Sequence, residues 1–251
     1  MNIAGYEKMT LQDYPGKVSA ICFVQGCQLR CPYCHNPNLV LPEMYSTRTE
    51  TDKRSAEFVA YVKKRKGMLD GIVLSGGEPL LQDDLLEVLY QFKEYGFSIK
   101  LDTNGMLPQR LKSLLDARLL DYVALDYKGS AEGLNRAIGR DSNGTAENHY
   151  ENWAKSLKVL SNSSVDYELR TTVAKEIHSG DHLLAMAKEL SSLLPRPVPR
   201  WFLQTFEKQT CLVGEFAIKA NPLSAYLKEE MLEIKNILRK IVPSVSLRNA
   251  H

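Results

Sequence analysis

The sequence predicts an α/β fold in which a parallel sheet forms a partial (β/α)6 TIM-like barrel, open on one side. Short apolar segments alternate six times with segments of helical periodicity, which predicts parallel strands joined by right-handed crossovers. Nearly every polar cluster follows the C-terminal end of an apolar segment, as on the catalytic face of a barrel. A doubly wound open sheet fits the same alternation, but the polar clusters favour a barrel, and six units indicate a partial one.

The expected strands are short runs rich in apolar and β-branched residues. They cover residues 18–25, 71–75, 97–102, 122–126, 166–173 and 201–206. Helical spacing predicts helices over 56–66, 81–94, 107–117, about 150–160 and 181–194.

The chain is expected to divide near residue 206. A barrel domain would cover residues 1–206, with a polar, glycine-rich connection after the fourth strand that includes Asn143-Gly144. The strand and helix pattern changes beyond it, so residues 207–251 form a predicted C-terminal extension, with an amphipathic helix over 222–241.

Composition narrows the class of function. The 251 residues include 32 Lys and Arg against 30 Asp and Glu, and this near balance argues against a nucleic-acid-binding protein. No stretch approaches the roughly 20 apolar residues that span a bilayer, so no membrane association is expected. The chain has five cysteines and opens with no secretory segment, which predicts a cytoplasmic protein with reduced thiols.

Cys27, Cys31 and Cys34 form a Cys-x3-Cys-x2-Cys motif in a loop after the first expected strand. Closely spaced thiols usually bind metal, because a thiolate is a soft anionic ligand suited to iron–sulfur centres or zinc. Three thiolates leave one iron of a four-iron cluster open, as a catalytic zinc keeps an open position. The motif therefore predicts chemistry rather than scaffolding.

Other interpretations of the cysteines stay open. A structural zinc site could use His35, although its adjacency to Cys34 makes joint ligation of one ion awkward. Disulfides fit less well because the number of cysteines is odd. Cys22 and Cys211 are expected to be packed thiols rather than ligands.

The segment Ser75-Gly76-Gly77-Glu78-Pro79 follows the second strand and opens the next helix. Two glycines allow a ligand to approach the backbone, and Glu78 adds a carboxylate. Strand-end carbonyls and a carboxylate suit a positively charged amino group. Taken alone, an ordinary strand-to-helix turn explains the motif equally well.

Charged residues end the next strands. Asp102 and Asp126, with Lys128, predict a polar site for a zwitterion, or for a cation that bridges to a carboxylate. Asp102 could instead make an Asx turn or a helix cap, and Lys128 could be an exposed loop residue. Arg170 lies inside an apolar strand, so we expect it to face the barrel mouth and to need a partner.

Together these motifs resemble the radical S-adenosylmethionine (SAM) superfamily. The cysteine loop, with an aromatic residue before its last cysteine, and the Gly-Gly-Glu-Pro segment carry that resemblance. Residues 31–37, 101–105 and 126–128 are similar to the activating enzymes of glycyl radical enzymes, including pyruvate formate-lyase activating enzyme. Residues 13–17 and 167–173 look most like the longer type of anaerobic ribonucleoside-triphosphate reductase activating protein. The resemblance runs from about residue 6 to residue 206.

The resemblance implies a [4Fe–4S] cluster held by Cys27, Cys31 and Cys34, whose open iron chelates the amino and carboxylate groups of SAM. It places Tyr33 near the adenine of the cofactor. The turn that receives the amino group consists of Gly76, Gly77 and Glu78.

Other residues acquire roles by the same resemblance. Asp102, Thr103 and Asp126 match the positions where pyruvate formate-lyase activating enzyme places a monovalent cation beside the cofactor carboxylate. Lys128 and Arg170 would help to hold the cofactor or an incoming peptide. Residues 35–100 contain no cysteine, so no auxiliary cluster is expected.

The implied reaction is radical formation on a protein partner. An electron from flavodoxin or ferredoxin enters the cluster, the S–C5′ bond of SAM breaks, and the 5′-deoxyadenosyl radical takes hydrogen from a glycine of a glycyl radical enzyme. The cofactor carries this chemistry, so no catalytic side chain is expected. The alternatives are a radical enzyme acting on a small molecule, like 7-carboxy-7-deazaguanine synthase, and a zinc-stabilised binding module.

Overall fold

A computed structural model describes residues 1–139, 149–207, 212–213 and 222–248. The chain divides into two compact units. Unit 1 comprises Met1–Gln28, Asn36–Thr103 and Gln109–Ala124, and unit 2 comprises Leu29–His35, Asn104–Pro108 and Leu125–His251. The expected boundary at residue 206 stays a prediction. Asn143, Gly144 and Cys211 lie outside the described residues.

Unit 1 carries a sheet in which the strands follow chain order. The edge strand β1 (Ile3–Thr10) is antiparallel to β2 (Ser19–Val24), and β3 (Gly71–Gly76) and β4 (Ser98–Thr103) continue in parallel. Strand β5 (Tyr122–Asp126) comes next along the chain. Just before it, the amide of Asp121 donates a hydrogen bond of 2.9 Å to the carbonyl of Ile99 on β4. Strands β2, β3 and β4 are nearly continuous buried runs, as parallel strands covered by helices are.

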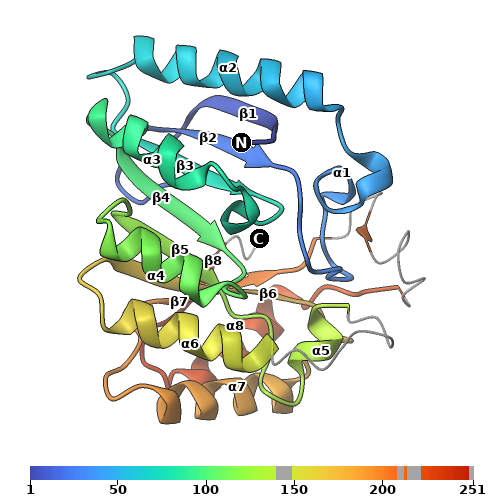
Figure 1. The fold of residues 1–251 in the computed structure, drawn as a ribbon. Coiled ribbons are helices and arrows are strands. Elements are labelled where there is room, and N and C mark those ends of the chain that lie inside the picture. The colour runs from blue at the N-terminus through green and yellow to red at the C-terminus, as the bar shows by residue number, and fades with distance from the viewer. Residues whose placement is uncertain (140–148, 208–211, 214–221, 249–251) are drawn as a thin grey trace. The chain divides into compact units, whose positions relative to one another are not determined.

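Helices cover the sheet of unit 1. Helix α2 (Arg48–Lys64) packs along β1, as Figure 1 shows, with Phe58 against Tyr6 at 5.4 Å between ring centroids. It begins earlier than predicted because a capping box of Thr47 and Glu50 starts it in a polar stretch. The other helices are α1 (Pro37–Val40), α3 (Leu85–Glu94) and α4 (Pro108–Asp116), with short 3-10 turns at Pro42–Met44 and Pro79–Leu81.

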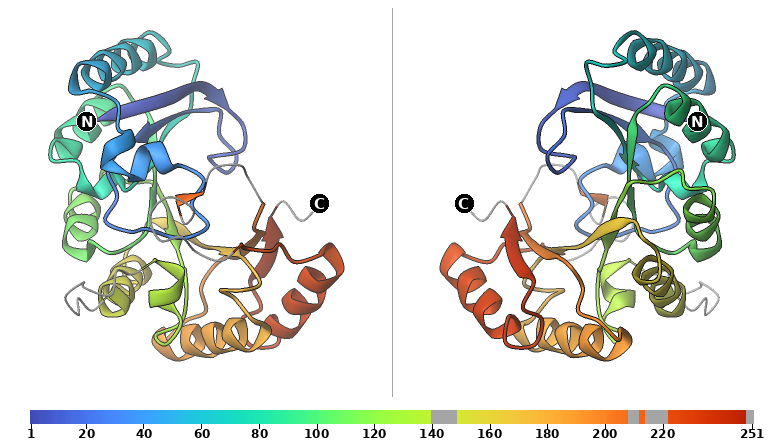
Figure 2. Two further views of the ribbon diagram at one scale, coloured as in Figure 1. Left: turned by 90° about the vertical axis from the view of Figure 1, so that its right-hand side faces the viewer. Right: turned by 90° about the vertical axis from the view of Figure 1, so that its left-hand side faces the viewer.

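Unit 2 contains a second set of parallel strands. Strands β6 (Asp166–Val173), β7 (Trp201–Thr205) and β8 (Val245–Arg248) pair in chain order. The helices are α5 (Leu134–Ala137), α6 (His149–Ser161), α7 (Gly180–Leu193) and α8 (Lys228–Leu238). Helices α7 and α8 lie side by side in Figure 2. The core of this unit centres on the fully buried side chains of Trp153, Tyr127 and Trp201.

The six predicted strands are confirmed, each within one residue at either end. The sequence analysis missed β1 and β8, which extend the sheet at its edges without closing it. The fold class is therefore confirmed as α/β with an open, mostly parallel sheet. The expected C-terminal helix is confirmed as α8, which is shorter than predicted.

Strand β8 attaches the end of the chain to unit 2 through a buried charge. Glu168 on β6 is fully buried, and its two carboxylate oxygens accept hydrogen bonds from Arg248 on β8 at 2.8 and 3.0 Å. The guanidinium of Arg248 also lies 4.0 Å from the ring centroid of Phe202 on β7. The C-terminal extension thus takes part in the sheet.

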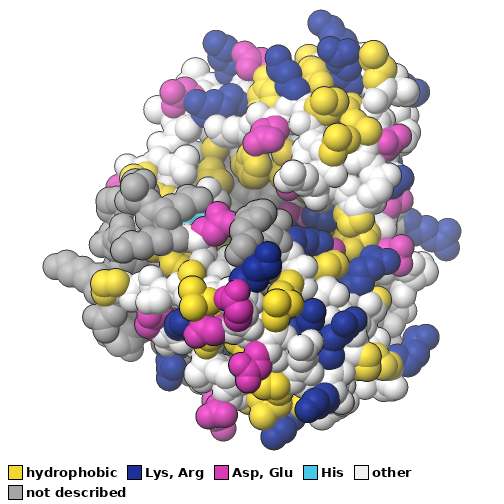
Figure 3. Space-filling view, turned by 180° about the vertical axis from the view of Figure 1, so that it is seen from behind, with side chains coloured by type: hydrophobic (Ala, Val, Ile, Leu, Met, Phe, Trp, Pro, Cys, Tyr) yellow, Lys and Arg dark blue, Asp and Glu magenta, His cyan; other side chains and the backbone are white. Residues whose placement is uncertain are grey.

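The face of the molecule in Figure 3 carries charges of both signs. In Figure 3, Lys and Arg side chains are interspersed with Asp and Glu side chains, in keeping with the formal net charge of +2. Within the part of the chain that the structure describes, every helix is too short or too polar to cross a bilayer.

The substitution Arg248→Met should destabilise the protein by about 3 kcal/mol, because it takes the arginine partner from a buried carboxylate. Chemical denaturation of the full chain measures this loss. The matched control is Lys112→Met, which removes an exposed i,i+4 pair with Asp116 and should cost less than about 0.5 kcal/mol. Equal losses in the two variants would contradict the structural role of the Glu168–Arg248 pair.

Candidate functional site

The turn after β3 depends on its glycines. Gly76 has φ +118°, and a Cβ there would lie 2.4 Å from the backbone nitrogen of Val24. A Cβ on Gly77 would lie 2.2 Å from the carbonyl oxygen of Gly26, the residue before Cys27. The amides of Gly77 and Glu78 donate to the carbonyls of Val24 and Gly26 at 2.8 and 2.7 Å. The motif is therefore a close backbone junction that holds the start of the cysteine loop.

Glu78 is a fully buried carboxylate in this junction. Its Oε1 accepts hydrogen bonds from the amide of Leu80 at 3.0 Å and from the hydroxyl of Thr103 at 2.8 Å. Two predicted site residues from neighbouring strand ends, Glu78 and Thr103, are thereby in direct contact. A buried carboxylate held in this way suits a cationic amino group as a further partner.

Asp102 is also buried at the end of β4, where 9% of its surface is exposed. Its Oδ2 accepts a hydrogen bond from Ser75 at 3.1 Å, and its Oδ1 accepts one from the ammonium of Lys100. The Asx turn that the sequence leaves open for Asp102 is made by Asn104, whose Oδ1 accepts from the amide of Met106 at 3.0 Å. Sequence reasoning did not identify Lys100.

The cysteine loop runs through both units, with Cys27 in unit 1 and Cys31 and Cys34 in unit 2. Within unit 2, Cys31 and Cys34 form a turn in which the amide of Cys34 donates to the carbonyl of Cys31 at 3.0 Å. The carbonyl of Cys34 accepts from the amide of Val213 at 2.9 Å. Arg30 donates its amide to the carbonyl of Ile138 at 3.0 Å, so backbone contacts support this part of the loop on both sides.

Cys27, Cys31 and Cys34 form no disulfide, and Cys31 is buried. Burial raises the pKa of Cys31 to about 11, only partly opposed by the charge of Lys128. A thiolate at this position therefore needs further positive charge, which a metal centre supplies. Among the described residues, no three His, Cys, Asp or Glu side chains are already grouped as metal ligands.

Asp126 links two cations at the end of β5 in unit 2. Its Oδ2 accepts from the ammonium of Lys128 at 2.9 Å, and its Oδ1 accepts from the guanidinium of Arg170 at 3.1 Å. Arg170, for which the sequence predicts a partner, thus has one on the neighbouring strand. Only 14% of the Lys128 side chain is exposed, so it is not the solvated loop lysine that the sequence left open.

Tyr33 lies beside this charged group. The ammonium of Lys128 is 5.8 Å from the centroid of the Tyr33 ring, within cation–π distance. Burial raises the pKa of Tyr33 well above its ordinary value, so its hydroxyl stays protonated. For Lys128, burial favours the neutral amine, but the carboxylate of Asp126 raises its pKa well above normal. The lysine is therefore a permanent cation.

Three side chains hold the backbone of the turn after β5. The indole of Trp153 on α6 donates to the carbonyl of Asp126 at 2.9 Å. The hydroxyl of Thr171 on β6 donates to the carbonyl of Tyr127 at 2.6 Å. The imidazole of His178 lies 2.9 Å from the carbonyl of Lys128. Asp126 and Lys128 are therefore presented from a fixed backbone.

His178 and His182 form a stacked pair that sequence reasoning missed. Their rings are 5.7 Å apart and 7° from parallel. Nδ1 of His178 accepts from the amide of Ala174, so its Nε2 carries the proton and donates to Lys128. Nε2 of His182 accepts from the amide of Ser130 at 3.2 Å. Both histidines accept a backbone amide and support the segment after β5.

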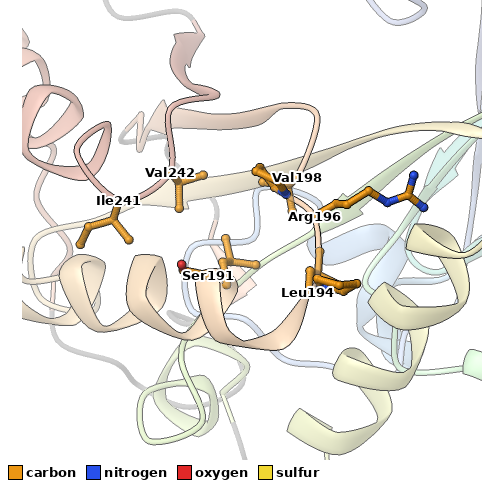
Figure 4. Close-up of a pocket in the computed structure, with 9 residues that line it drawn as sticks. Ser191, Leu194, Arg196, Val198, Ile241 and Val242 are labelled. Atoms are coloured by element: carbon orange, nitrogen blue, oxygen red, sulfur yellow. The ribbon is translucent and has the colours of Figure 1, made fainter.

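Two other features lie away from these groups. Cys22 is fully buried in β2, and burial raises the pKa of its thiol to about 12, as for a packed thiol. A surface pocket of about 220 Å³ lies between the end of α7 and the segment before β7. In Figure 4, Val242 and Val198 lie above Ser191 and Leu194. This pocket adjoins the N-terminal end of β7, whereas the candidate residues follow the C-terminal ends of strands.

The family follows from a comparison with known families. The model of the radical SAM superfamily matches residues 21–172, which include the cysteine loop, the Gly-Gly-Glu turn and Arg170. The chain belongs to the radical SAM superfamily. Members of this superfamily are enzymes that use a [4Fe–4S] cluster and SAM, and the thiols of Cys27, Cys31 and Cys34, once deprotonated, are donors of the type that such a cluster takes.

Relatives of this radical SAM protein include activating enzymes. A protein of Methanocaldococcus jannaschii bears the name of a glycyl-radical enzyme activating enzyme. It is 29% identical to this chain, and the similarity covers 98% of this chain and 95% of the length of that protein. Pyruvate formate-lyase-activating enzyme of Clostridium pasteurianum is 36% identical over 50% of this chain and 52% of its own. That second similarity spans about half of either protein.

Solved structures share the fold of this radical SAM protein. SuiB of Streptococcus suis, determined with bound SAM, has a TM-score of 0.64 and 13% identity, over 90% of this chain and 48% of its own. A domain of pyruvate-formate lyase-activating enzyme from Bacteroides vulgatus has a TM-score of 0.53 and 16% identity, over 71% of this chain and 99% of its own.

The neutral state of His178 predicts a pH dependence of stability. Burial lowers the pKa of His178 to about 4, below its value of about 6.5 in an unfolded chain. Between these values the unfolded chain binds a proton that the folded chain does not, so stability falls as the pH falls. From about pH 7 to about pH 4.5, the wild type should lose about 2 kcal/mol more than His178→Gln in denaturant titrations. Parallel pH profiles for the two proteins would refute this assignment.

Proposed function

We propose that this radical SAM enzyme generates a glycyl radical on a partner enzyme. The observation that carries the proposal is the similarity to an activating enzyme over 98% of the chain, which includes the C-terminal extension. The similarity to pyruvate formate-lyase-activating enzyme supports the same class of reaction. The motifs at 13–17 and 167–173 favour anaerobic ribonucleoside-triphosphate reductase as the partner. The resemblance to the activating enzymes implies flavodoxin or ferredoxin as the electron donor.

Cys27, Cys31 and Cys34 would hold the cluster in this proposal. The chain keeps the three within reach of one another, because only three and two residues separate them. When bound, the cluster supplies the electron that cleaves SAM to methionine and a 5′-deoxyadenosyl radical. The junction at Gly26 and Gly77 and the backbone contacts of Arg30 and Cys34 orient the ligand loop.

Residues at the strand ends would bind SAM. The buried carboxylate of Glu78, held by Thr103, would accept the amino group, and Gly76 and Gly77 keep the turn close to the backbone of Val24 and Gly26. Asp102 lies at the adjoining strand end, where it accepts a hydrogen bond from Ser75.

The charged group of unit 2 would face the rest of the cofactor or the peptide. Tyr33 offers a flat apolar surface for the adenine, and burial keeps it uncharged. Lys128 and Arg170, both paired with Asp126, direct positive charge towards a carboxylate or a peptide carbonyl. We leave a monovalent cation out of the proposal, because Asp102 and Asp126 already pair with cations of the protein.

Isotope transfer tests the proposal directly. The reconstituted enzyme is incubated anaerobically with SAM, a reductant and anaerobic ribonucleotide reductase labelled with α-deuterated glycine. Deuterium should appear in 5′-deoxyadenosine, and the reductase should acquire a glycyl radical signal. Unlabelled 5′-deoxyadenosine formed with a small-molecule substrate, and none with the reductase, would favour the small-molecule alternative.

Single cysteine variants test the cluster ligands. Cys27→Ala, Cys31→Ala and Cys34→Ala should each lose most of the iron bound after anaerobic reconstitution, because a cluster with two thiolate ligands is held weakly. Iron analysis and the visible absorption of the cluster measure the loss. Cys22→Ala is the matched control, since this buried thiol lies in β2 and should leave the iron content unchanged. Full iron binding by any of the three variants would remove that cysteine from the ligand set.

A further inference from the structure

The sheet of unit 1 contains a buried lysine. Lys100 lies in the middle of β4 and is 2% exposed. It is two residues before Asp102, so both side chains emerge on the same face of the sheet. The ammonium of Lys100 contacts Oδ1 of Asp102, and the two side chains are 3% and 10% exposed.

The surroundings of Lys100 are apolar. Its neighbour in register on β3 is Val73, which forms a buried cluster with Tyr14, Ile21 and Tyr122. A hydrophobic residue at position 100 would pack against this cluster without the cost of burying an ammonium group. The charge at this position therefore has a role other than packing. Among the described residues, Asp102 has the only carboxylate shown in contact with the ammonium of Lys100.

Asp102 thus has protein partners on both oxygens. Oδ1 receives the ammonium of Lys100, and Oδ2 receives the hydroxyl of Ser75 at 3.1 Å. One carboxylate and one ammonium sum to zero charge. Before the cofactor and its carboxylate bind, a monovalent cation added to Asp102 would leave a net positive charge in a buried place, where like charges repel strongly. The residues around Asp102 do not fit such an ion.

Asp126 in unit 2 follows the same pattern. Lys128 contacts one of its oxygens at 2.9 Å, and Arg170 contacts the other at 3.1 Å. Two permanent cations already face this single carboxylate. Considered separately, each of the two carboxylates that the resemblance assigns to a monovalent cation has its charge met by lysine or arginine.

We propose that Lys100 is a built-in cation that takes the place of a monovalent metal ion at Asp102. The inference rests on the proposed function, because it assumes that Asp102 belongs to the SAM site. Lys100 acts as a positioning residue: it neutralises Asp102 from within the sheet and fixes the carboxylate against Ser75. The protein then needs neither sodium nor potassium to complete this part of the site.

The test compares cation dependence in the wild type and in Lys100→Gln. Thermal unfolding of the reconstituted full chain is measured in NaCl, KCl and choline chloride at equal ionic strength. The wild type should have the same Tm in all three salts. Lys100→Gln should unfold at a lower temperature, and sodium or potassium should raise its Tm by about 3 °C over choline, because the small cation can then occupy the vacated position.

Sodium-23 NMR supplies a direct readout of binding. Line broadening by a slowly exchanging sodium ion should occur with Lys100→Gln and not with the wild type. Lys112→Gln is the matched control, since it removes an exposed ammonium group from the pair with Asp116 and should behave as the wild type does. Lys100→Arg keeps a positive charge and should also stay independent of the salt.

Two results would overturn the proposal. One is a higher Tm, or sodium broadening, for the wild type in sodium or potassium. The other is a folded Lys100→Gln protein without any response to these ions. If Lys100→Gln does not fold, Lys100→Gln/Asp102→Asn, which removes both charges, must fold without cation dependence for the proposal to stand. None of these readouts uses a glycyl radical partner, so absence of deuterium transfer would refute the proposed function and leave the cation result intact.

Discussion

Charge compensation at the carboxyl ends of the strands is the constraint on which the candidate site depends. A parallel strand that is buried on both faces can carry a charged side chain only where an opposite charge lies within reach. Asp102 pairs with Lys100 of the same strand, and Asp126 with Arg170 of the neighbouring strand and with Lys128 just beyond its own. Because these partners belong to the sheet or adjoin it, the polar groups are in place before any cofactor binds.

In the turn after β5, hydrogen bonds from side chains to the backbone also hold the polar groups in place. The carbonyls of Asp126, Tyr127 and Lys128 accept hydrogen bonds from side chains of α6, β6 and the segment between β6 and α7. Each such bond contributes about 1 kcal/mol, and losing any of them would leave a buried carbonyl without its partner. These three bonds therefore restrain the turn, and with it the direction of the charged side chains that it carries.

The sequence predicts the central strands well and the edges poorly, for a physical reason. Buried parallel strands are continuous apolar runs, whereas β1 has an exposed edge and β8 has only four residues. Arg170 could be recognised because an arginine in an apolar strand needs a partner. Lys100 is likewise a charged residue in an apolar strand, two residues before an aspartate. Its apolar surroundings are set by the neighbouring strand, which the sequence around Lys100 does not show. His178 could not be recognised, since only the folded chain brings it to the carbonyl of Lys128.

The segment Asp126-Tyr127-Lys128 contributes both to the candidate site and to the core of unit 2. Asp126 and Lys128 pair with each other, whereas the ring of Tyr127 stacks on Trp153 at 4.2 Å and its hydroxyl donates to the carbonyl of Met186 at 3.1 Å. The aromatic residue therefore anchors the turn to α6 and α7, and the charged residues on either side of it remain with Arg170 and Tyr33. A change at Tyr127 would act on the charged group through its position, although the ring itself lies in the core.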